Sequence, residues 1–169
     1  MRRIARAGLV ALAVSSAGCD PVHADAIAAL GGEAPGVPPG PLHRPGQPCG
    51  LCHDGAFNDP PAFSLAGTLY LDATGLTPVS GAAVILEDSN FVTSPPGTSN
   101  EAGNFYWTPE QFTPKYPVQV NSVTVDTGVA IAMHSHIGGN GSCAGCHVDP
   151  PAPDSPGHIY TNVPPGMTP

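Results

Sequence analysis

Apolar and polar residues alternate along four short stretches of the chain between residues 63 and 137. Glycine, proline and asparagine separate the stretches, which are residues 63–72 (FSLAGTLYLD), 81–88 (GAAVILED), 103–107 (GNFYW) and 116–137 (YPVQVNSVTVDTGVAIAMHSHI). A period of two places successive side chains on opposite faces of a strand, so each stretch is expected to bury one face. The pattern therefore predicts an all-β fold, a small antiparallel sandwich or barrel.

Local detail follows from the same alternation. Ala82, Val84 and Leu86 fall on one face of the second stretch, which we expect to face the core. In the fourth stretch the alternation changes phase at Asn121 and Ser122, and a change of phase predicts a β-bulge there. In the first stretch the core face is expected to carry the leucines, and Ser64, Thr68 and Tyr70 are expected on the outer face.

Residues 20–48 have a different composition. They are rich in Ala, Gly and Pro and show no apolar periodicity, which predicts an extended tether. Only residues 25–30 hint at a helical turn. Residues 164–169 are expected to form a short tail.

The first nineteen residues have the layout of an export signal. Arg2, Arg3 and Arg6 precede a short apolar run, and small residues follow it. The segment SSAGC resembles a bacterial lipobox in which Cys19 becomes the lipidated first residue, although Ser16 replaces the usual aliphatic residue. We therefore expect an exported protein held by a lipid in the periplasm or on the outer membrane or cell surface, with plain secretion as the alternative.

Removal of that signal makes the chain strongly acidic. Arg44 and Lys115 remain as the basic residues against thirteen acidic ones, so the net charge is 2 − 13 = −11. Such a surface repels nucleic acid and favours partners with a basic docking face. The content of 22 prolines and 21 glycines suits a β protein rich in turns.

Two short motifs carry the candidate chemistry. CGLCH occupies residues 49–53 and CAGCH occupies residues 143–147. In a Cys-x-x-Cys-His motif both cysteines form thioether bonds to one haem, and the histidine is the axial ligand of its iron. The motifs predict two c-type haems, with the anchors and axial histidines as follows: Cys49, Cys52 and His53 for the first, and Cys143, Cys146 and His147 for the second.

The four cysteines also allow two other uses. The pairs could together form one four-cysteine zinc site, or each pair could form a disulfide in an oxidising compartment. Both alternatives leave the histidine that follows each pair without a role. Two haems use every residue of both motifs, and no thiol is left over once Cys19 is set aside.

The order of three segments resembles a known domain. FSLAGTLYLD, TPVSGAAVILEDS and TSNEAGNFYW together resemble the carboxypeptidase regulatory-like domain, a small prealbumin-like sandwich. The residues that fit its signature are Pro78, Gly81, Ala82, Val84, Gly103 and Phe105. The region from Cys49 to Tyr160, with a haem motif on each side and GHIY near its end, resembles a family of small exported dihaem c-type cytochromes.

That resemblance implies a division of the chain. The haems would be attached to loop segments flanking the sandwich, within one dihaem domain over residues 49–163. Its parts would be a first haem segment (49–62), the sandwich (63–133) and a second haem segment (134–163).

The second axial ligands are not fixed by spacing. The candidates are His136, His43, His158, Met133 and His134, with Met167 a weaker one and His23 set aside as too close to the lipid anchor. His136 precedes the turn GGNGS that leads into the second motif, and the resemblance also favours a histidine there. Met133 shares the face of Ile131, which favours a place in the core. For the other haem the choice lies between His43 and His158.

The function expected from these features is electron transfer between redox proteins, not enzymatic catalysis. An adhesion or binding module with a structural or sensory haem is one alternative, and a small dihaem peroxidase is another. Self-assembly of the chain into filaments is compatible with electron transfer.

Overall fold

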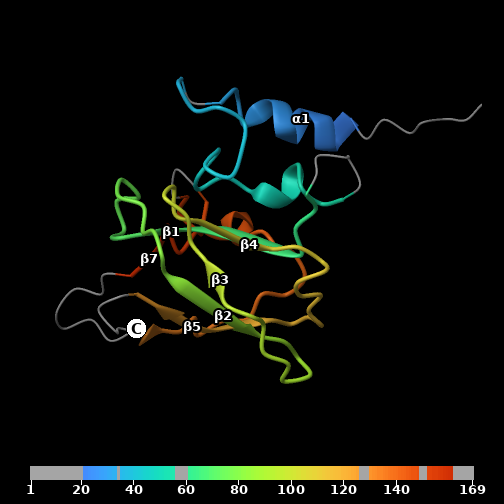
Figure 1. The fold of residues 1–169 in the computed structure, drawn as a ribbon. Helices are drawn as coiled ribbons and strands as arrows, with labels where there is room; N and C mark the ends of the chain where they lie inside the picture. Colours follow the sequence, from blue (N-terminus) through green and yellow to red (C-terminus); the bar gives the residue numbers. More distant parts are fainter. Residues whose placement is uncertain (1–20, 34, 56–60, 126–129, 149–151, 162–169) are drawn as a thin grey trace, which may run out of the picture.

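A computed structural model describes residues 21–33, 35–55, 61–125, 130–148 and 152–161. The described chain is mostly β, with one α-helix and two short 3-10 turns (Figure 1). Its strands form two sheets, one in the order β4-β1-β7 and one in the order β3-β2-β5-β6. The strands are β1 (Leu65–Tyr70), β2 (Ala83–Glu87), β3 (Gly97–Thr98), β4 (Asn104–Trp107), β5 (Gln119–Thr124), β6 (Ala130–Ile131) and β7 (Ile159–Tyr160). The helices are α1 (Pro21–Ala29), η1 (Cys49–Leu51) and η2 (Cys143–Gly145).

The three-stranded sheet is mixed. Strand β1 runs antiparallel to β4, with Leu65 opposite Trp107, and parallel to β7, with Leu69 opposite Ile159. Strand β7 can pair in the parallel sense because the chain reaches it by a long connection through the second Cys-x-x-Cys-His motif, not by a hairpin. The expected all-β fold is therefore present, but the arrangement is not purely antiparallel.

One apolar core lies between the two sheets. Leu65 and Leu69 of β1 and Trp107 of β4 meet Val84 and Leu86 of β2, and each of these side chains is almost fully buried. Ala82 is buried together with Val84 and Leu86. This confirms that the predicted face of residues 81–88 points into the core.

The predicted bulge in β5 is confirmed. Ile85 of β2 pairs with Ser122, and the next residue, Leu86, pairs with Val120. Asn121 is thus the extra residue, and the phase of the alternation changes there.

Strand β1 is buried on both faces, unlike the prediction of a polar outer face. Thr68 is buried, and its hydroxyl is satisfied there, because it donates to Oδ1 of Asn104 at 2.8 Å and accepts the N–H of Gly46 at 2.8 Å. The amide of Asn104 donates in turn to the carbonyl of His43 at 2.9 Å. Residues before the first motif therefore cover this face.

The N-terminal segment differs from the extended tether predicted for residues 20–48. Its helix α1 spans nine residues, longer than the single turn expected, and it lies above η1 in Figure 1. The carbonyl of Pro41 accepts hydrogen bonds from Asn100 and Asn104, which fix this segment to the sheet. Side-chain hydrogen bonds to a sheet cannot be read from composition, which is why the sequence suggested a free linker.

Several expectations fall outside the described residues. These are the export signal, lipidation of Cys19, the tail and Met167. Among the residues that are described, no helix combines the length and the apolar character needed to cross a membrane.

Asp88 ties the β2–β3 turn to the loop before β5. Its carboxylate accepts the N–H groups of Asn90 and Val92 at 2.9 Å each and that of Lys115 at 3.1 Å. These backbone hydrogen bonds, the one from Val92 first and that from Lys115 next, hold the pKa of the Asp88 carboxyl below its usual value.

We expect Asp88→Asn to lower the melting temperature at pH 7. A carboxyl whose pKa is lower in the folded state stabilises the fold above its unfolded pKa, and this contribution is lost as the pH falls through the folded pKa. The variant should therefore differ less from the parent at pH 3 than at pH 7 in thermal melts followed by circular dichroism. Equal differences at both pH values would contradict the assignment.

Candidate functional site

Both Cys-x-x-Cys-His motifs form the same turn. The N–H of His53 donates to the carbonyl of Cys49 at 2.9 Å, and the N–H of His147 donates to that of Cys143 at 2.9 Å. Each motif begins with a 3-10 turn, η1 or η2, which is compatible with the small residue after the first cysteine. The same local geometry therefore recurs at two places in the chain.

Each motif histidine is held by its Nδ1 atom. Nδ1 of His53 lies 2.8 Å from the carbonyl oxygen of Pro61, and Nδ1 of His147 lies 2.7 Å from that of Gly157. A carbonyl only accepts, so Nδ1 carries the proton and the lone pair of each ring is on Nε2. Metal-bound histidines are commonly oriented in this way.

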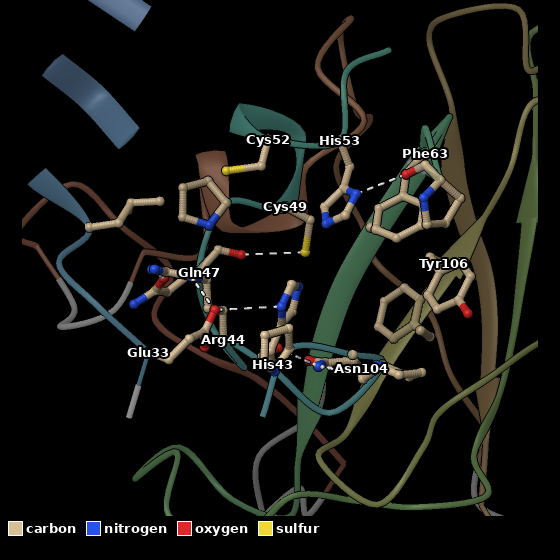
Figure 2. A pocket seen from close by; sticks show the side chains of 18 of the residues that line it. Glu33, His43, Arg44, Gln47, Cys49, Cys52, His53, Phe63, Asn104 and Tyr106 are labelled. Carbon is tan, nitrogen blue, oxygen red and sulfur yellow. Dashed lines mark hydrogen bonds and ion pairs between the residues drawn. The ribbon is translucent and has the colours of Figure 1, made fainter. Parts of the chain in front are cut away.

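Each motif lines its own cavity. The first cavity, of about 500 Å³, is bounded by Cys49, Cys52 and His53 and by apolar side chains that include Ile27 and Phe63. Figure 2 shows the sulfur of Cys49 near the imidazole ring of His53. Its size lies in the range of pockets that hold cofactors, about 300–1,000 Å³. Ile27 belongs to α1, so the segment predicted as a tether forms part of the wall.

The second cavity, of about 460 Å³, opens beside the second motif. Cys143, Cys146 and His147 line it together with side chains from both sheets, among them Leu69 and Val123. Each cavity thus places the two thiols and the imidazole of one motif in a largely apolar space. Such a space suits a flat apolar ring with a metal at its centre.

The structure separates the candidates for a second ligand. His43 lines the first cavity, whereas His136, His158 and Met133 line the second. His134 is exposed and lines neither of these two cavities. The choice left open by the sequence between His43 and His158 is therefore a choice between two different sites.

The three candidates at the second cavity differ in their surroundings. His158 is buried, with its Nδ1 atom 3.2 Å from the carbonyl oxygen of Ala73 and its ring edge-on to Tyr70 at 4.9 Å. His136 is exposed at the rim. Met133 is half-buried in the cavity wall and is not part of the core cluster, where the alternation had placed it.

The two motifs lie next to each other. A Cβ atom on Gly50 would lie 3.4 Å from Cβ of Ser142, the residue before the second motif. Ala66 of β1 pairs with Ser142 as well, and Phe105 lines both cavities. Nothing in the sequence indicated this proximity, because it results from both motifs packing against β1.

Burial also affects the thiols. It raises the pKa of Cys49 and raises that of Cys143 to about 12, and the charge on Cys49 acts in the same direction on Cys143. The surroundings of both thiols therefore favour the protonated form.

The two alternatives to haem were a disulfide in each motif and one zinc ion shared by the four cysteines. All four motif cysteines are free thiols. Among the described residues, no three His, Cys, Asp or Glu side chains form a group that could hold a metal ion. A haem iron needs no such group, because the porphyrin itself supplies four of its ligands.

Comparison of the chain with known protein families, with curated proteins and with solved structures finds no match.

Proposed function

We propose that this chain is an electron-transfer protein, a c-type cytochrome that carries two covalently attached haems. The observation that carries the proposal is the pair of adjacent apolar cavities, each containing one Cys-x-x-Cys-His motif whose histidine is held through Nδ1. The residues present fit the group, because each cavity offers two thiols for attachment and one Nε2 lone pair for the iron.

The chain supplies attachment and orientation. Cys49 and Cys52 would hold one haem, and Cys143 and Cys146 would hold the other, through thioether bonds to the vinyl groups. His53 and His147 would each offer the Nε2 lone pair to an iron, and their rings are held by the carbonyls of Pro61 and Gly157. The bound haem supplies an iron that alternates between the ferric and ferrous states.

The proximity of the motifs supports transfer between the two sites. Gly50 and Ser142 are in contact distance, and the buried ring of Phe105 lies at the wall of both cavities. An electron accepted at one site would have a short path through packed side chains to the other. Neither site requires a substrate pocket for this function.

The remaining parts of the proposal rest on the sequence. They are a prealbumin-like sandwich of the carboxypeptidase regulatory-like kind, export with lipidation at Cys19, and location in the periplasm or at the cell surface. The net charge of −8 for the whole chain, and of −11 if the export signal is removed, supports a redox partner with a basic docking face.

Electron exchange with small reagents of opposite charge tests the function. We expect the full chain, produced with a c-type haem assembly system, to be reduced faster by a cationic ruthenium ammine than by an anionic reagent of similar potential. Added salt should reduce the difference, because it screens the acidic surface. The measurement is stopped-flow absorbance at a series of salt concentrations.

Two results would overturn the proposal. A chain with one haem or none lacks the required cofactors. A chain with a high-spin iron that turns over peroxide would be an enzyme instead. If the rates are equal for both reagents and independent of salt, the assignment of two haems would stand. The expectation of a redox partner with a basic face would then be wrong.

A further inference from the structure

His43 faces the histidine of the first motif across the first cavity. The centroids of the His43 and His53 rings are 5.7 Å apart, with their planes tilted by 52°. In Figure 2 the two rings point toward each other from opposite sides, with the sulfur of Cys49 beside the space between them. His43 comes from the segment between α1 and η1, so two different parts of the chain bring the imidazoles together.

The separation suits one iron between two imidazoles. Metal–imidazole bonds are about 2 Å long, which places the centroids of two rings on opposite sides of one metal roughly 6.3 Å apart. The 5.7 Å found here is shorter than that value. The two rings would therefore have to move apart slightly to hold one iron between them.

A carboxylate oxygen of Glu33 lies beside the ring of His43. Nδ1 of His43 lies 3.6 Å from Oε1 of Glu33, and that same oxygen accepts a hydrogen bond from Nε of Arg44 at 2.9 Å. Arg44 also donates to the side chain of Gln47 at 2.8 Å and to the carbonyl of Gly31 at 2.8 Å. A carboxylate beside Nδ1 favours the proton there and places the lone pair on Nε2, the arrangement common around metal-bound histidines.

The backbone of His43 is fixed to the sheet. Its carbonyl accepts the amide of Asn104 at 2.9 Å, and its N–H donates to the carbonyl of Gly40 at 3.1 Å. Asn104 belongs to β4 and is itself held by Thr68 of β1. His43 is therefore part of a fixed wall, although it lies in a proline-rich segment.

The first cavity offers few other ligands. Among the described residues that line it, His43 and His53 are the histidines, and none is a methionine. We propose that His43 is the second axial ligand of the first haem iron and that Glu33 positions it. This inference rests on the proposed function and makes the first iron six-coordinate, with a low potential and closed to added ligands.

Replacement of His43 tests the inference in the full two-haem chain. His43→Ala is expected to convert one of the two irons from low-spin to high-spin, seen by electron paramagnetic resonance and resonance Raman spectra. The ferrous variant should bind carbon monoxide at one haem per chain, and imidazole added to the solution should restore the low-spin spectrum. His23→Ala is the matched control, because His23 lies on α1 in the same segment and does not line the cavity.

Two further variants separate ligation from folding. His43→Met should keep two attached haems while raising the midpoint potential of one, since methionine ligation raises the potential. Glu33→Gln should leave both irons low-spin and raise the potential of one haem, because the carboxylate no longer acts on Nδ1 of His43. These two variants decide the question if His43→Ala does not accumulate.

The outcomes are distinguishable from failure of the proposed function. If His43→Ala keeps two low-spin irons and binds no carbon monoxide, or if His43→Met leaves both potentials unchanged, His43 is not the ligand although the chain is still a dihaem protein. A change of the same size in His23→Ala would also overturn the inference. Absence of haem from the unaltered chain would overturn the proposed function itself.

Discussion

The full chain produced with a c-type haem assembly system is expected to carry two haems, and Cys49→Ala with Cys52→Ala is expected to carry one. Each motif lines its own cavity, so loss of the thiols in one cavity leaves the other pair intact. The corresponding change of Cys143 and Cys146 should leave the other haem. With all four cysteines replaced, no covalent haem should remain.

Intact-protein mass spectrometry and haem absorbance per chain measure this outcome. Each double variant serves as the control for the other, because both remove two thiols from equivalent turns. The two single-haem proteins should differ in their spectra or potentials, since different side chains line the two cavities. Equal haem content in all four proteins, or a mass that fits zinc, would contradict the assignment of the motifs.

Replacement of Gly67 by Val is expected to reduce attachment of the second haem. A Cβ atom at Gly67 would lie 2.8 Å from Sγ of Cys143, 2.9 Å from its Cβ and 2.8 Å from Cζ of Phe105. No real Cβ lies so close, so the anchor cysteine or the Phe105 ring must move. Overpacking of this kind costs about 1–3 kcal/mol in a well-packed core. A displaced Cys143 would also meet the porphyrin edge in the wrong position.

The measurement is haem content per chain together with the midpoint of chemical unfolding. Gly67→Ala should show a smaller change in the same direction. Gly139→Ala is the matched control. Gly139 lines the second cavity, as Cys143 does, and a Cβ atom on Gly139 meets nothing within 4 Å. Full attachment of both haems in Gly67→Val would show that the second motif does not depend on this close contact.

Much of the fold was predictable from local patterns. The alternation predicted the strands β1, β2 and β4, the core face of Ala82, Val84 and Leu86, and the bulge at Asn121. These features depend on residues a few positions apart. The two-residue strands β3 and β7 carry too few positions for a periodic signal, and the parallel pairing of β7 depends on a partner far away in the chain.

The candidate site was predictable in part. The motifs identified the thiols and the first histidine of each cavity, and spacing alone accounts for that. Glu33, Gly67 and Phe105 were not identified as site residues, because their roles arise from contacts with distant segments. The same holds for the choice between His43 and His158.

The sequence by itself determined which residues share one turn, since the cysteines and the histidine of each motif lie within five consecutive positions. Only the tertiary structure decided which histidine shares a cavity with which motif, and that the two motifs lie side by side on β1. The physical reason is the range of the interactions: a turn is closed by hydrogen bonds between near neighbours, whereas a cavity is closed by side chains that the sheet order brings together.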